Sequence, residues 1–238
     1  MDDTGDLHNL PRPRWRIHET AIIGGSREDE LVIAAGFLRV AEAGARQWIE
    51  HGPDDRLPIP ILYNCRHGIE LTLKWLIRLT ARCAVRSGYT GSENLSSSEP
   101  DDKLHTHNIE KLADRLDRYM GLLEVDAPNN CIDGASRELL DWLDSEDETG
   151  ETGETYRYST VGVGAKKAAA RPNQTNINFY ERVNEVHKPA NLPQAGYTGF
   201  LDNHEQMRID YYADMRDIHA GIDADIDFAP DVDHYTGL

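Results

Sequence analysis

Residues 60–86, PILYNCRHGIELTLKWLIRLTARCAVR, decide the fold. Pro60 suits the first turn of an α-helix, and Ser87 and Gly88 close the segment. Apolar side chains recur at three- and four-residue intervals along one face, namely Leu62, Cys65, Ile69, Leu73, Leu76 and Ile77. Because the segment is so rich in apolar residues, we expect this helix to run through the centre of a helical bundle.

Further helices are predicted on both sides of this segment. Apolar residues recur at helical spacing in the ranges 28–50, 107–124, 133–144, 175–188 and 203–222. The fifth helix is expected to stop before Pro189, and the sixth to turn Met207 towards the core. Tyr156, Tyr158 and Val161 favour a short strand or hairpin. The sequence therefore predicts an all-α bundle of five or six helices with a small β-like insertion.

The same pattern divides the chain into three parts. Residues 1–27 are polar and contain two prolines, so they are expected to form an N-terminal arm. Residues 28–222 are expected to form one helical domain. Residues 223–238 carry several Asp and no Lys or Arg, which is typical of an acidic C-terminal tail.

The negative net charge of the chain bears on which ligands and macromolecules it can bind. The chain has 42 acidic and 25 basic residues, and its formal net charge is -17. A large negative field repels polyanions, whereas extensive binding to duplex DNA needs many Lys and Arg contacts with phosphate. The composition therefore argues against extensive binding to duplex DNA, although one local basic cleft would suffice for a nucleotide or a single strand of RNA.

The apolar runs and the cysteines point to a reduced, cytoplasmic protein. No run approaches the roughly 18 residues of a membrane span, and the N-terminus lacks the apolar segment of a signal peptide. The three cysteines form no CxxC pair. We therefore expect no membrane association, no disulfide framework and no metal site, and the sequence implies no cofactor.

A polar stripe accompanies the apolar face of the central helix. Tyr63, His67, Glu70 and Lys74 share one side because residues three, four and seven apart align on a helix. Arg66 lies one turn before Glu70 and can pair with it. One interpretation is a solvated face of ordinary ion pairs. The other is a functional site, because charges near the centre of a bundle must be paired or used, and a histidine there can act as acid or base.

Two other segments bring candidates to this site. His107 stands near the start of the helix at 107–124, next to Asn108, and approaches the Arg66 region if that helix packs antiparallel to the central one. Its alternative role is that of a solvent-exposed residue at a helix end. Arg157 lies between two tyrosines and can pair with a carboxylate such as Glu70, or else belong to a surface strand.

The order of these motifs resembles a group of helical proteins in the HEPN-like superfamily. Its pattern is RHxxEL-x-LK, then H-x-[IL]-x-x-L, then an aromatic-Arg-Tyr-Pro segment. The residues that match it here are Arg66, His67, Glu70, Leu71 and Lys74, then His107 and Leu112, then Tyr156, Arg157 and Tyr158. Ser159 stands where the family has proline. The resemblance covers about residues 30–160.

The resemblance implies a catalytic hypothesis. Superfamily members that cleave RNA without metal carry Arg, four to six residues, then His, and their sites often form across a dimer. Arg182 and His187 have that spacing, but Arg66 and His67 are adjacent and do not. In such a site the histidine moves the proton and the arginine stabilises charge on the phosphate.

Two functions remain open at this point. The first is a metal-independent endoribonuclease of a toxin or antiphage defence system. Its catalytic candidates are Arg66, His67, Glu70, His107, Arg182 and His187, and its RNA- or nucleotide-binding candidates are Lys74, Arg157 and Tyr158. The second is a non-catalytic helical binding or scaffold module that acts with a partner protein. A homodimer is expected in either case, because such bundles often pair through long helices.

Overall fold

The computed structural model describes the helical core and shorter pieces of the rest. The described residues are 30–93, 95, 104–123, 132–145, 156, 160–161, 168–169, 176–190, 201, 203, 206–207, 209–210 and 213–217. The predicted arm at 1–27 and tail at 223–238 lie outside these residues, so the three-part division of the chain stays a prediction.

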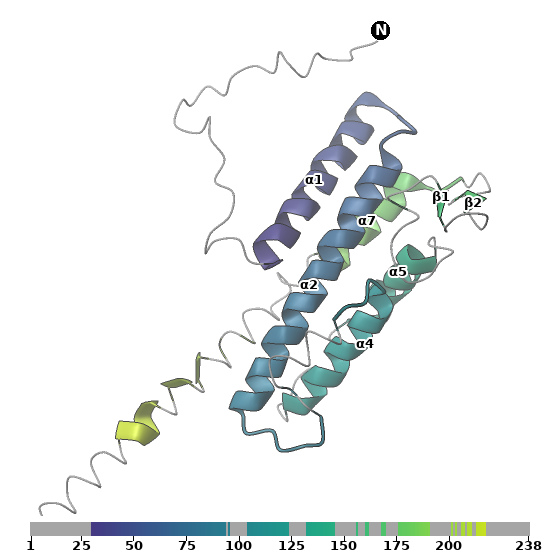
Figure 1. Cartoon of the computed structure of the whole chain (residues 1–238). Helices are drawn as coiled ribbons and strands as arrows, with labels where there is room; N and C mark the ends of the chain where they lie inside the picture. Colours follow the sequence, from purple (N-terminus) through teal and green to yellow (C-terminus); the bar gives the residue numbers. More distant parts are fainter. Residues whose placement is uncertain are drawn as a thin grey trace, which may run out of the picture.

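In the described part of the chain, five α-helices form the bundle, and α2 lies between its neighbours (Figure 1). Their bounds are α1 Glu30–His51, α2 Pro58–Arg86, α4 Ile109–Met120, α5 Gly134–Ser145 and α7 Phe179–Ala190, with the short 3-10 helix η3 at Gly121–Leu123. Most of α2 is buried, because α1, α4 and α7 pack against it. The predicted all-α fold and the central place of this helix are confirmed.

α1 and α2 form an antiparallel hairpin that is held close by two glycines. A Cβ atom on Gly44 would stand 2.9 Å from the Ile61 side chain. A Cβ atom on Gly68 would stand 2.7 Å from Leu38 and 3.1 Å from the Ala34 carbonyl oxygen. Both glycines therefore allow an approach that a larger residue would prevent.

Replacing Gly68 by Ala is expected to lower the free energy of unfolding by about 1–3 kcal/mol, because the added methyl overpacks the α1–α2 contact. Urea denaturation measures the change. Gly121→Ala is the matched control, since Gly121 has a helical φ of -62° and open space around the position of a Cβ. Equal stabilities of the two variants would contradict the close approach at Gly68.

α4 runs in the same direction as α2, which corrects the antiparallel packing considered from the sequence. The start of α4 lies at Glu70, where His107 contacts its carboxylate, and its end lies at Thr80, whose hydroxyl contacts Met120. α5 then runs antiparallel to α4, because Arg137 near its start pairs with Asp114 at 2.5 Å. His107 thus reaches the central helix by a different route from the one expected.

Helix ends follow the local sequence closely. Asn108 caps α4, where its side chain accepts a hydrogen bond from the Lys111 N–H at 2.7 Å. Asp133 caps α5 in the same way through the Ser136 N–H, also at 2.7 Å. After α1, Gly52 adopts a φ of +92°, a conformation that glycine tolerates without strain.

Three local predictions are wrong or only partly right. A two-stranded antiparallel ladder joins β1, Thr160–Val161, to β2, Ala168–Ala169, so a small β insertion is present, but Tyr156 is helical. α7 continues through Pro189. Met207 is 65% exposed and does not face the core. Half of the residues of the predicted sixth helix, 203–222, are described, and all of these are helical, which agrees with the prediction.

Two further predictions bear on the class of protein. Within the described residues, no helix combines the length and the apolar character needed to cross a bilayer. Cys65 and Cys83 are buried, and burial raises the pKa of the Cys65 thiol to about 12. Cys131 lies outside the described residues.

Candidate functional site

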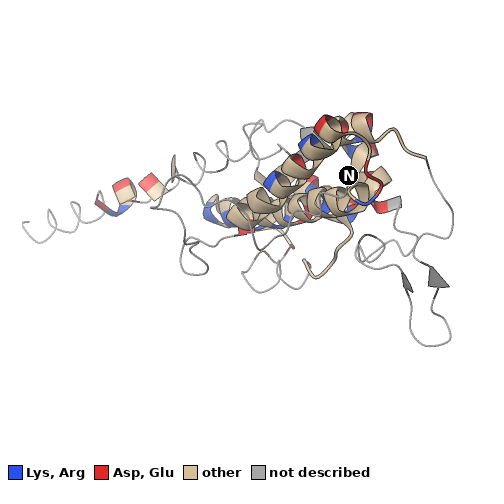
Figure 2. Cartoon of the chain, turned by 90° about the horizontal axis from the view of Figure 1, so that it is seen from above, with Lys and Arg blue, Asp and Glu red and all other residues tan. Residues whose placement is uncertain are grey.

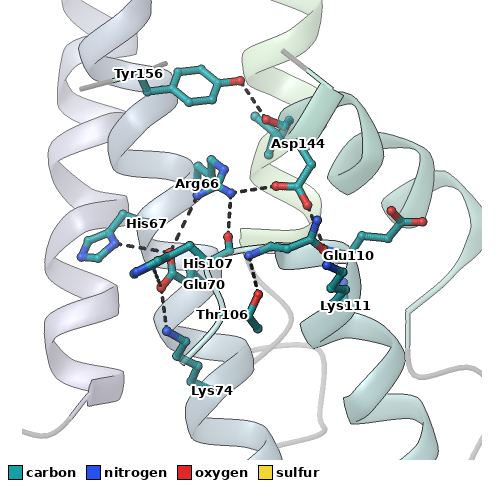
Figure 3. A network of polar contacts seen from close by, with 12 residues as sticks. Arg66, His67, Glu70, Lys74, Thr106, His107, Glu110, Lys111, Asp144 and Tyr156 are labelled. Carbon is teal, nitrogen blue, oxygen red and sulfur yellow. Dashed lines mark hydrogen bonds and ion pairs between the residues drawn. The ribbon is translucent and has the colours of Figure 1, made fainter. Parts of the chain in front are cut away.

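The site forms where α2, the start of α4 and the end of α5 meet (Figure 3). Its centre is the buried pair of Arg66 and Glu70 on α2, whose residues are 3% and 2% exposed. Their spacing of four residues brings the guanidinium to 3.8 Å from the carboxylate. Buried charges need partners, and each of these two residues has stronger contacts elsewhere.

Arg66 is held by the two later helices. Its Nη2 atom donates to the Asp144 carboxylate at 2.8 Å and to the His107 carbonyl at 2.6 Å. The other oxygen of Asp144 accepts from the Glu110 N–H at 3.1 Å, in the first turn of α4. Asp144 thus links α5 to both α2 and α4. One donor of the guanidinium, Nε, has no hydrogen-bond partner in the described part of the chain.

Glu70 collects cationic and imidazole groups. Lys74 donates to its Oε1 at 2.8 Å, and Nδ1 of His107 lies 2.9 Å from the same oxygen. Nδ1 of His67 lies 3.8 Å from Oε2. Burial alone would raise the pKa of Glu70, but His67, Lys74 and His107 outweigh it and lower the pKa to about 2. Glu70 is therefore a carboxylate at neutral pH.

The second carboxylate behaves differently. Burial raises the pKa of Asp144 above its ordinary value, and neither the Glu110 N–H nor Arg66 offsets this effect. The two carboxyl groups of the site, Glu70 and Asp144, thus face two basic side chains, Lys74 and Arg66.

The two histidines form the accessible edge of the site. The His107 side chain is 48% exposed and that of His67 is 28% exposed. The ring of His67 is stacked on Tyr63, with centroids 5.8 Å apart and planes within 6°. Phe37 of α1 meets the same ring edge-on at 4.5 Å. His67 is therefore held by aromatic neighbours, whereas His107 is the more open of the two.

The structure brings together five of the nine residues proposed from the sequence: Arg66, His67, Glu70, Lys74 and His107. Arg182 lies on α7, where it pairs with Glu185 at 2.9 Å and covers the Trp142 ring at 4.8 Å. Arg157, Tyr158 and the His187 side chain lie outside the described residues.

Sequence reasoning missed Asp144 and misplaced Tyr156. Tyr156 is buried, and its hydroxyl donates to the Leu143 carbonyl at 3.0 Å, beside Asp144 (Figure 3). A signal for Asp144 existed, because it follows Leu140 by four residues and so continues the apolar face of α5. An acidic residue in such a position calls for a buried partner.

Lys and Arg are interspersed with Asp and Glu along the described helices (Figure 2). Within the described residues, no group of three or more His, Cys, Asp or Glu is arranged to hold a metal ion. No protein-family model, curated protein or solved structure matches the chain.

Proposed function

We propose that the chain is a helical scaffold module that acts by binding another protein chain. The observation that supports this most is the state of Arg66. Its guanidinium is buried and already donates to Asp144 and to the His107 carbonyl. Because the residue is only 3% exposed, a phosphate could reach the remaining donors only after the surrounding helices moved apart. An arginine bound in this way fixes the packing of helices and does not recognise a ligand.

The outer face of α1 is the best candidate for the binding surface. Three of its apolar side chains, Val32, Ile33 and Val40, are 56%, 38% and 59% exposed. Gly36, Ala43 and Gln47 lie on the same side and are also exposed. The helix thus has a second, mainly uncharged face, besides the one that packs on α2, and Arg39 and Glu50 lie at its border. A helix that is apolar on both sides usually has a partner on each.

We commit to a second copy of the chain as that partner. Copies of a chain with a net charge of -17 repel each other, so they can associate only where the contact carries no charge or balanced charge. The outer face of α1 meets this requirement, because the Arg39 cation and the Glu50 anion at its border balance each other. Its small residues Gly36 and Ala43 allow two helices to approach closely around a two-fold axis.

Val40→Glu is expected to convert a dimer into a monomer and to raise the dissociation constant at least about tenfold, because it buries an unpaired charge in the contact. Sedimentation velocity measures the change. Val85→Glu is the matched control, since Val85 is 51% exposed on α2 and lies outside this face. A wild-type chain that stays monomeric at its highest soluble concentration would contradict the proposed partner.

A metal-independent endoribonuclease, as the HEPN-like resemblance implies, is the second candidate. The observation that favours it is the meeting of His67 and His107 at Glu70, from two separate elements. Two accessible imidazoles beside a carboxylate can serve as the base and the acid of RNA cleavage. A ribonuclease of this kind would fit a toxin or defence system, with RNA as its partner. Arg66 would then position His107 through its carbonyl, and groups other than Arg66 would bind the phosphate.

The purified chain distinguishes the two candidates when it is incubated with RNA in the presence of EDTA. The ribonuclease candidate requires cleavage that His107→Ala or His67→Ala lowers by about 10²-fold or more. His187→Ala tests the alternative pair with Arg182, and His51→Ala is the control on an exposed histidine of α1. RNA that stays intact over a range of sequences and salt concentrations would leave the scaffold function.

A further inference from the structure

The contact between Glu70 and His107 determines where the imidazole carries its proton. Glu70 is ionised at neutral pH, since its pKa is about 2. An ionised carboxylate accepts hydrogen bonds and cannot donate one. Nδ1 of His107 lies 2.9 Å from Oε1 of Glu70, so this nitrogen must be the donor. The neutral ring of His107 is therefore the Nδ1–H tautomer.

That tautomer leaves the lone pair of His107 on Nε2. The Nδ1 edge of the ring faces a carboxylate whose side chain is only 3% exposed. The side chain of His107 is nevertheless 48% exposed, and Nε2 lies on the edge of the ring opposite Glu70. A ligand can approach this half-exposed ring from solvent, and Nε2 is the nitrogen that does not face Glu70.

We propose that Glu70 and His107 form a carboxylate–imidazole dyad in which Nε2 of His107 accepts the proton of a ligand hydroxyl. The O–H bond breaks, an N–H bond forms at Nε2, and the electron pair stays on the ligand oxygen. Glu70 remains ionised beside the imidazolium and keeps the ring in place, which is the role of a carboxylate in such pairs. This activity goes beyond the scaffold function.

The inference also deepens the ribonuclease candidate and, for RNA as the ligand, rests on it. The hydroxyl would then be a ribose 2′-OH. Its oxygen bonds to the adjacent phosphorus and expels the 5′-oxygen, which takes a proton from an acid or from water. His67 is less suited to act as the base, because its Nδ1 lies 3.8 Å from Glu70 and its ring is stacked on Tyr63.

Nitrogen NMR of the wild-type chain tests the tautomer directly, at a pH above the titration of the ring that the same spectra record. A two-bond proton–nitrogen correlation spectrum is expected to show a protonated Nδ1 and an unprotonated Nε2 for His107. In Glu70→Gln the amide can donate as well as accept, so a mixture of tautomers is expected. If Glu70 served only packing, the tautomer would be unchanged by this substitution. An Nε2–H tautomer in the wild-type chain would overturn the proposal.

Diethyl pyrocarbonate tests whether Nε2 is accessible and reactive. The nitrogen attacks a carbonyl of the reagent and expels ethyl carbonate, and peptide mass spectrometry locates the modified residue. His51 is the matched control, since its Nδ1 faces the Gln47 carbonyl at 3.2 Å and its ring is exposed. We expect His107 to react at least as fast as His51, and Glu70→Gln to slow His107 several-fold. A His107 that resists the reagent while His51 reacts would refute the dyad.

These results separate the inference from the candidate functions. Intact RNA, together with an Nδ1–H tautomer and a reactive His107, would refute the ribonuclease and leave the dyad as a site for another hydroxyl ligand. Cleavage of RNA by a chain whose His107 is the Nε2–H tautomer would refute the dyad and leave the ribonuclease. The wild-type measurements need no substitution, so they stand even if Glu70→Gln fails to fold.

Discussion

Replacing Arg66 by Met is expected to lower the free energy of unfolding by about 3–5 kcal/mol, the cost of breaking a buried ion pair from one side. Met fills a similar volume, so the loss comes from charge and not from a cavity. The substitution leaves the buried Asp144 without its cation and the His107 carbonyl without its donor. Urea denaturation monitored by circular dichroism measures the loss.

Arg46→Met is the matched control for this substitution. Arg46 also pairs with a carboxylate four residues away, Glu42, at 2.7 Å, but its side chain is 69% exposed. Solvent screens an exposed pair, so this change is expected to leave the free energy of unfolding almost unchanged. Similar losses in the two variants would show that Arg66 does not hold three helices together.

Acid is expected to remove about 3 kcal/mol of stability through Glu70 alone. Its pKa falls from an ordinary 4.5 to about 2 in the folded chain. The folded state therefore binds the proton less readily than the unfolded state. The stabilisation is complete above about pH 5, and it is lost as the pH falls towards 2. At about 1.4 kcal/mol for each unit of pKa, the shift has the stated size.

The contribution of Glu70 is measured as a difference between two pH profiles of stability. Between pH 6 and pH 2.5, the wild-type chain is expected to lose about 2–3 kcal/mol more than Glu70→Gln. Glu42→Gln, on the exposed face of α1, should follow the wild-type profile. Parallel profiles for the wild type and Glu70→Gln would mean that Glu70 is not held as a carboxylate. Because the pKa of Asp144 is raised, Asp144 takes its proton before Glu70 does.

The central helix and the first half of the site could be predicted because they depend on local spacing. A period of three to four residues is enough to place Arg66, His67, Glu70 and Lys74 on one part of α2. Five helices were placed within a few residues of their ends for the same reason. The RNA and defence hypotheses come from the resemblance, and they remain predictions.

The second half of the site depends on contacts that no local pattern contains. Asp144 is 78 residues from Arg66 in the sequence. It directly precedes a run rich in Asp and Glu, so nothing in the sequence distinguishes it from the acidic residues of that run. His107 was expected near Arg66 only if α4 ran antiparallel to α2. The structure has the opposite direction, because α4 begins beside Glu70 and ends beside Thr80. The spacing of apolar residues predicts that a helix forms, but it does not predict in which direction that helix packs against its neighbour.

The sequence separation of these contacts also bears on the rates of folding and unfolding. Arg66 meets His107 across 41 residues and Asp144 across 78, so both contacts must wait until long stretches of chain have closed. Interactions that form late are absent from the transition state for folding. They slow unfolding and leave the rate of folding almost unchanged. We therefore expect the buried ion pairs at the junction of α2, α4 and α5 to lower the rate of unfolding and so to prolong the lifetime of the folded chain.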